Sequence, residues 1–151
     1  MKYYIGADHA GIEIKAFVKE LFEKLGHEVE DLGPYCTDRV DYPDFASKVC
    51  QAVLKDDSSK GILICGTGLG MSMAANKFDG IRAALCHNEY SAAMAREHND
   101  ANVLCLGERV SGQGMVEAIV KSWDTNEFAG GRHAGRVDKI NAITKMGSCR
   151  V

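Results

Sequence analysis

The chain has 151 residues, of which 46% are hydrophobic and 26% charged, and its formal net charge is -3. This length and composition fit one domain over residues 1–151 and exclude a disordered or low-complexity protein. The acidic balance argues against a general binder of nucleic acid or anionic membranes, because such proteins normally carry a basic excess. No apolar run approaches the roughly 20 residues of a membrane span or resembles a signal peptide, so a cytoplasmic location is expected.

The first half of the chain alternates strand and helix patterns. A short β-rich run at residues 3–5 precedes apolar residues at helical spacing over 14–25, and Gly26 can end that helix. A second strand begins at Val29 and closes at the turn 33–34. Pro43 is placed to open the next helix, which carries an apolar stripe at Ala46, Val49, Cys50 and Val53.

The second half repeats the alternation. Residues 61–65 are continuously apolar, which is typical of a strand buried on both faces. Further strands are expected at 82–86 and 103–106, and helices at 70–77, 89–98 and 112–125. The order of elements predicts an α/β protein with a three-layer, Rossmann-like (flavodoxin-like) fold, in which helices cover both faces of a five-stranded parallel sheet.

The alternation stops at Asn126. Gly130 and Gly131 precede a last helical stretch at 136–146, and residues 126–151 are interpreted as a C-terminal extension that packs on a neighbouring subunit. The tail after Ala142 suggests no function.

Reactive side chains follow three of the predicted strands. Asp8 and His9 follow the first, Cys65 ends the third, and Arg109 follows the fifth. Ligands of open parallel sheets bind beyond the carboxyl ends of the strands. We therefore expect these three loops to converge on one candidate site.

The loop after Cys65 has glycines at alternate positions, Gly66, Gly68 and Gly70. Its backbone N–H groups and the start of the following helix would stabilise an anion, and the same field would favour the thiolate of Cys65. On the residues alone, an equally good interpretation is a tight turn after a buried cysteine.

Several other kinds of site are excluded by spacing. The glycine run lacks the last interval of a dinucleotide fingerprint, and Met71 and Ser72 stand where a phosphate-binding P-loop needs Lys and Ser or Thr. The five histidines show no metal-ligand spacing, so neither a metal nor a cofactor is expected.

Three further residues carry weaker signals. His98 ends a predicted helix, where a histidine commonly acts only as a cap. Arg132 and Arg136 lie four residues apart beside two glycines. Such a pair suits a phosphate group, although it also fits a solvated surface.

Five stretches resemble the ribose-5-phosphate isomerase B family, which includes galactose-6-phosphate isomerase subunits and allose-6-phosphate isomerases. They are GADHAG (6–11), DYPDFA (41–46), ILICGTGLGMSMAANKFDGIRAALC (62–86), REHNDANVLCLGERV (96–110) and GGRH (130–133). The resemblance covers nearly the whole chain. It implies an aldose–ketose isomerase that needs no metal.

The resemblance implies a role for each matching residue. Cys65 would be the base that moves a proton between C1 and C2 through a cis-enediolate, and His98 would open the furanose ring with help from Thr67. The backbone amides of the loop would form the anion hole, namely those of Gly66, Gly68, Gly70, Met71 and Ser72. Asp8, Tyr42 and Asn99 would contact the sugar, and His9, Arg109, Arg132 and Arg136 would hold the phosphate.

The resemblance also implies a homodimer, possibly a dimer of dimers, in which His98 and Asn99 complete the partner's site. Ribose 5-phosphate is the favoured substrate, with allose 6-phosphate and galactose 6-phosphate as alternatives, because the sequence does not reveal the depth of the pocket. A non-catalytic module that binds a phosphorylated ligand through the glycine loop is a less favoured alternative.

Overall fold

The computed structural model of the chain describes residues 1–147 and contains one parallel sheet of five strands. The strands are β1 (Lys2–Ala7), β2 (Glu28–Asp31), β3 (Lys60–Cys65), β4 (Ala83–Leu85) and β5 (Val103–Gly107), in the spatial order β2-β1-β3-β5-β4. The helices are α1 (Ile12–Lys24), α2 (Tyr42–Leu54), α3 (Leu69–Ala75), α4 (Glu89–Glu97), α5 (Gln113–Thr125) and α6 (Ala134–Gly147), with a 3₁₀ turn η1 (Gly131–His133) before α6. The predicted alternation and the parallel sheet are confirmed.

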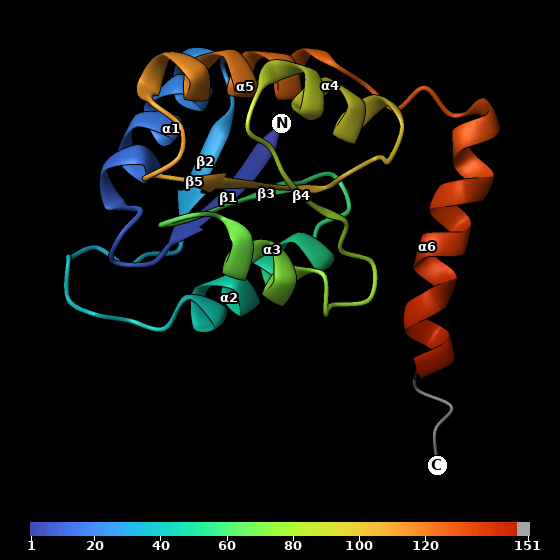
Figure 1. Cartoon of the computed structure of the whole chain (residues 1–151), viewed down its shortest axis with the longest axis horizontal. Coiled ribbons are helices and arrows are strands. Elements are labelled where there is room, and N and C mark those ends of the chain that lie inside the picture. The colour runs from blue at the N-terminus through green and yellow to red at the C-terminus, as the bar shows by residue number, and fades with distance from the viewer. Residues whose placement is uncertain (148–151) are drawn as a thin grey trace.

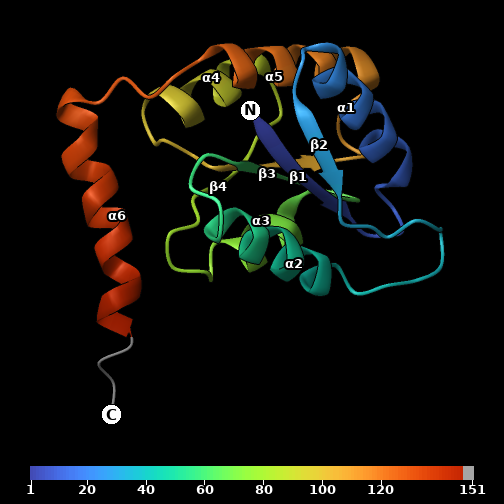
Figure 2. The same ribbon diagram turned by 180° about the vertical axis from the view of Figure 1, so that it is seen from behind.

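Helices cover both faces of the sheet, as predicted. α1, α4 and α5 lie on one face, and α2 and α3 lie on the other (Figures 1 and 2). Successive side chains of β3 point to opposite faces, so Ile62 and Ile64 join the core under α1, α4 and α5, whereas Leu63 joins the core under α2 and α3. This burial on both sides explains the continuous apolar run. Each such side chain contributes about 1.5–3 kcal/mol by leaving water.

Side-chain hydrogen bonds set two element ends that differ from the prediction. α3 ends at Ala75 rather than at 77, because the Asn76 amide group bonds to the backbone N–H and carbonyl of Ala83. β4 begins at Ala83 rather than at 82, because the N–H of Arg82 donates to the side-chain oxygen of Asn102 (2.8 Å). Asparagine amides thus replace backbone partners at both ends.

The C-terminal extension lies beside the sheet rather than in it. α6 stands apart from the helical layers near the β4 edge (Figure 1). His133 and Val137 are buried at its start, and the N–H of Ala129 donates to the carbonyl of Glu97 (3.0 Å). Further along, Ile140 and Ile143 are 43% and 66% exposed. The packing of this helix on a second subunit remains a prediction.

Candidate active site

The loops after β1, β3 and β5 are hydrogen-bonded to one another. The N–H of Asp8 donates to Ile64 O (3.1 Å), that of Glu108 to Cys65 O (2.9 Å), and that of Arg109 to Gly66 O (3.0 Å). All three loops lie at the carboxyl edge of the sheet. Their predicted convergence is therefore confirmed.

Cys65 lies at the point where the three loops meet. Its side chain is 5% exposed, and its Sγ accepts a hydrogen bond from the backbone N–H of Gly68 at 3.1 Å. A donor aimed at sulfur stabilises a negative charge there more than a neutral thiol. Burial raises the pKa of Cys50 to about 12 and that of Cys86 to about 11, so these two core thiols stay protonated at neutral pH.

The glycine loop lies so close to its neighbours that side chains would not fit. A Cβ on Gly68, whose φ is +76°, would lie 2.5 Å from Leu85 Cδ1, and a Cβ on Gly107 would lie 2.6 Å from the backbone of Thr67. A Cβ on Gly70 would lie 2.6 Å from Cζ of Tyr42, so the tyrosine ring covers this part of the loop. The glycines hold the backbone between β5 and Tyr42.

The backbone amides of this loop have different partners. Gly68 donates to sulfur, Leu69 to Thr67 Oγ1 (3.3 Å), and Ser72 to Gly68 O (3.0 Å). The amides of Gly70 and Met71 have no protein acceptor within residues 1–147. Of the amides expected to bind an anion, the Gly68 N–H is therefore occupied by the Cys65 sulfur and the Ser72 N–H by α3, whereas those of Gly70 and Met71 are available.

Met71 can contribute only through its backbone, because its side chain is fully buried in the core under α2 and α3. Thr67 is exposed at the loop surface. The side chain of Ser72 donates to Leu69 O (2.8 Å), inside α3. The loop therefore presents backbone amides and the Thr67 hydroxyl outward.

The remaining predicted groups at this edge are polar and close to the loop. Asp8 is 7% exposed and accepts from the N–H of Ala10 (2.9 Å), while His9 Nδ1 accepts from the N–H of Val40 (3.4 Å). The Arg109 guanidinium lies beside Gly66, with Nη1 3.3 Å from the position of a Cβ there. The loops after β1 and β5 thus bring a carboxylate, an imidazole and a guanidinium group to the same edge of the sheet as Cys65.

Glu108 is a member of this edge to which the sequence analysis gave no role. Its Oε2 accepts from the N–H of Ile14 (3.3 Å), so it supplies the cap that Gly11 cannot give to α1. Burial raises the pKa of Glu108, and the nearby charges of Glu13 and Asp8 raise it further. An acidic residue directly after a strand was the only signal available in the sequence.

The other four predicted residues form a second group. His98 is the C-cap of α4, and its ring stacks on that of His133 with centroids 4.1 Å apart and planes 9° apart. Asn99 follows it and is exposed, and Arg132 and Arg136 are exposed on η1 and α6. Burial lowers the pKa of His133, and the positive charges of His98 and the two arginines lower it further.

These two groups lie at opposite ends of the sheet. The chain after α4 passes the start of β3, where Asn102 O accepts from the N–H of Gly61 (2.9 Å). Cys65 ends the same strand, and four residues of strand span about 13 Å. The structure therefore does not bring His98, Asn99, Arg132 and Arg136 to Cys65 within one chain.

Two further properties concern the described residues as a whole. Among them, no three side chains of His, Cys, Asp or Glu gather as a metal ion would require. None of the helices in this part of the chain combines the length and apolarity needed to cross a bilayer.

Comparison with known proteins shows similarity over almost the full length. The profile of the ribose/galactose isomerase family matches residues 3–140. A putative sugar phosphate isomerase of Bacillus subtilis is 50% identical over 93% of this chain and 95% of its own, and ribose-5-phosphate isomerase B of Escherichia coli is 46% identical over 94% and 95%. The structure of ribose-5-phosphate isomerase B from Clostridium thermocellum superimposes with a TM-score of 0.95 at 53% identity, covering 97% of this chain and 99% of that one.

Proposed function

Because the chain belongs to the ribose/galactose isomerase family, we propose that it interconverts ribose 5-phosphate and ribulose 5-phosphate through a cis-enediolate. The observation that carries this proposal is the environment of Cys65, whose sulfur accepts the Gly68 N–H beside two unpaired amides. A base next to an anion hole is what proton transfer beside a carbonyl requires.

In the proposed reaction, the Cys65 thiolate removes the proton from C2 of the open-chain aldose. The electron pair moves into the C1–C2 bond, and O1 becomes the negatively charged oxygen of the enediolate. The N–H groups of Gly70 and Met71 stabilise that charge, and they do so most in the transition state. The proton on O2 then moves to O1, so that the negative charge lies on O2. The protonated Cys65 returns its proton to C1 while C2 and O2 form the carbonyl group of the ketose.

The substrate would lie between Cys65 and the polar groups of the neighbouring loops. Asp8 and Tyr42 border the glycine loop and are suited to the sugar hydroxyls and the ring oxygen. His9 and Arg109 would hold the phosphate, and Thr67 would assist ring opening. The burial of Asp8 and the contact of Tyr42 with Gly70 support this arrangement.

We assign His98, Asn99, Arg132 and Arg136 to the site of a second copy of the chain. The strand length that separates them from Cys65 supports this assignment, as do the exposed Ile140 and Ile143 on α6. The chain would act as one domain in a homodimer, with residues 126–151 packed on the partner. His98 would then act as the acid/base that opens the furanose ring.

The test is a coupled isomerase assay with ribose 5-phosphate, allose 6-phosphate and galactose 6-phosphate under the same conditions. We expect kcat/KM to be highest for ribose 5-phosphate. A higher value for a six-carbon substrate would reassign the substrate and leave the isomerase chemistry intact. Absence of turnover with all three would overturn the proposed function.

A further inference from the structure

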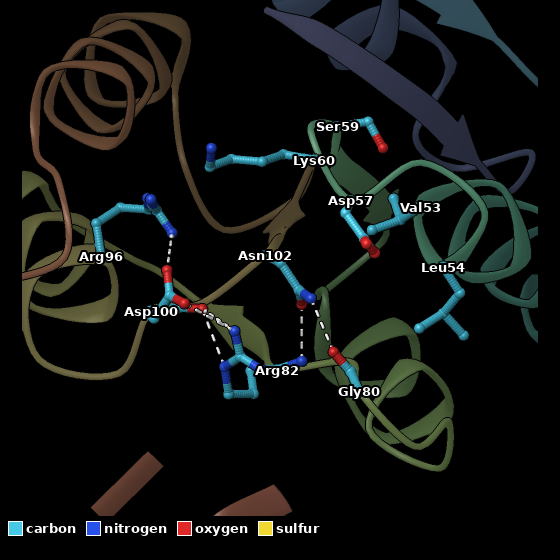
Figure 3. Close-up of a pocket in the computed structure, with 10 residues that line it drawn as sticks. All are labelled: Val53, Leu54, Asp57, Ser59, Lys60, Gly80, Arg82, Arg96, Asp100 and Asn102. Atoms are coloured by element: carbon cyan, nitrogen blue, oxygen red, sulfur yellow. Dashed lines mark hydrogen bonds and ion pairs between the residues drawn. The ribbon is translucent and has the colours of Figure 1, made fainter. Parts of the chain in front are cut away.

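A cavity lies at the end of the sheet opposite Cys65. It encloses about 310 Å³ at the start of β3 and of β5 and beside the end of α2 (Figure 3). This volume is at the lower end of the range of small-molecule sites. None of the residues assigned to the isomerase site lines it, so the proposed function does not account for it.

Basic side chains outnumber acidic ones in its wall. Lys60, Arg82 and Arg96 are the cationic residues, and Asp57 and Asp100 are the acidic ones. Figure 3 shows Lys60 and Arg96 on one side of the cavity and Asp57 with Leu54 on the other. The wall is thus electropositive where Lys60 and Arg96 lie.

Arg82 is occupied within the protein. Its Nε donates to the carbonyls of Asn99 (3.1 Å) and Asp100 (3.0 Å), and its Nη2 to the carbonyl (2.7 Å) and carboxylate (3.1 Å) of Asp100. Its Nη1 donates to the side chain of Asn141 (3.3 Å). Arg82 therefore fixes the wall at Asp100, where a non-glycine residue has a φ of +44°.

Lys60 and Arg96 are less well satisfied. Within residues 1–147, no carboxylate forms an ion pair with Lys60, and the Lys60 ammonium contacts the thioether of Met1 (3.1 Å), a weak acceptor. The bonds of Arg96 to the Asp100 carboxylate (3.2 Å) and the Ala101 carbonyl both come from Nη1, although a guanidinium has five N–H donors. Burial lowers the pKa of Lys60, and the charge of Arg96 lowers it further.

We propose that this cavity binds the phosphate group of a small phosphomonoester, held between Lys60 and Arg96. A dianion would screen the two cations from each other, and a phosphate can accept from a guanidinium and an ammonium together. The carbon part of the ligand would lie against Val53 and Leu54, which form the apolar side of the cavity. The negative charge of Asp57 opposes the binding of a phosphate, so removing this charge should increase the affinity of the cavity for phosphate.

The experiment is an NMR titration of the ¹⁵N-labelled full chain, first with inorganic phosphate and then with glycerol 3-phosphate. The amides of Gly61, Gly80 and Asn102 report on this cavity, and that of Gly70 reports separately on the isomerase site. We expect saturable shifts at the cavity with both probes. Lys60→Gln should weaken binding at the cavity about tenfold or more, because it removes a partly buried charge contact.

Two variants serve as matched tests. Lys55→Gln removes the same charge from an exposed residue that follows Leu54 but does not line the cavity, and it should leave the cavity affinity unchanged. Asp57→Asn removes the opposing charge from an exposed position and should tighten binding about two- to fivefold. This second variant tests the proposal even if Lys60→Gln does not fold.

The proposal is overturned if the cavity amides do not shift while Gly70 does, or if Lys60→Gln and Lys55→Gln have equal effects. It is also overturned if Asp57→Asn weakens binding. Exclusion of glycerol 3-phosphate from a cavity that accepts inorganic phosphate would rule out a phosphomonoester as the ligand.

Discussion

The two ends of the sheet present their polar groups in opposite ways. At the carboxyl end, Cys65 and Asp8 are buried and hydrogen-bonded among three loops of one chain. At the other end, Arg132 and Arg136 project from η1 and α6 into solvent. The first end is preorganised for charge stabilisation. In the proposed homodimer, the second end would become part of such a site only when the partner chain covers it, and the following predictions test this contrast.

The largest effect is expected at the preorganised end. Cys65→Ala should lower kcat for ribose 5-phosphate by about 10⁴-fold or more, since it removes the base proposed to move the proton. Steady-state kinetics with a coupled assay measures this. Cys50→Ala is the control, because Cys50 is a core thiol whose loss should reduce stability and leave kcat nearly unchanged. Equal losses in both variants would remove the special role of Cys65.

The preorganised end was also the part that the sequence described best. A continuously apolar strand followed by alternating glycines implies a backbone packed tightly beyond a strand end, and the contacts of Gly68 and Gly107 have that form. The details that the sequence left open depend on individual hydrogen bonds. The partner of the Ser72 amide and the cap that Glu108 gives to α1 arise from contacts that no local pattern encodes.

The distance between the group around Cys65 and the group around His98 was harder to predict from the sequence. His98 follows a helix, and whether it faces Cys65 depends on which end of the sheet that helix reaches. The bond between Asn102 and Gly61 fixes this, because it puts the turn after α4 at the start of β3. Residues 148–151, in the tail to which we assigned no function, lie outside the described residues.

A site shared between two chains predicts complementation, which is the second-largest effect. Cys65→Ala and His98→Ala should each be nearly inactive, but mixing them after reversible dissociation should restore activity. Random pairing makes half of the dimers mixed, and each mixed dimer has one intact site of two, so recovery should approach about a quarter of the wild-type value.

The mixing experiment has a built-in control. Each variant taken alone through the same dissociation and reassociation should stay inactive. Mass spectrometry shows whether mixed dimers have formed. If the mixture stays inactive although they have, the two residues serve the same site in one chain or different reactions. The proposed sharing of one site between two chains is then wrong.

A smaller effect is expected from the exposed arginines. Arg136→Ala should raise KM about 10- to 100-fold and change kcat less, because a phosphate contact remote from C1 and C2 stabilises the bound substrate and the transition state alike. Lys139→Ala removes an exposed cation from the same helix and should leave KM unchanged. A fall in kcat alone would contradict phosphate binding by Arg136.

The smallest effect concerns the stability of the second end and its dependence on pH. The pKa of His133 is lowered in the folded chain by burial and by the positive charges of His98, Arg132 and Arg136. In the unfolded chain it returns to about 6.5, so below that pH the unfolded state binds more protons. The stability from a neutral His133 is therefore complete above about pH 6.5 and is lost as the pH falls below this value and through the lower pKa of the folded chain. Replacement by phenylalanine keeps a ring stacked on His98 and removes the titration. Thermal unfolding at about pH 7.5 and about pH 5.5 should thus show a smaller loss of Tm for His133→Phe than for the wild type.

The control for this prediction is His87→Phe, at an exposed position, which should keep the wild-type dependence of Tm on pH. If His133→Phe loses as much Tm on acidification as the wild type, protonation of His133 is not what links the stability of this end to pH.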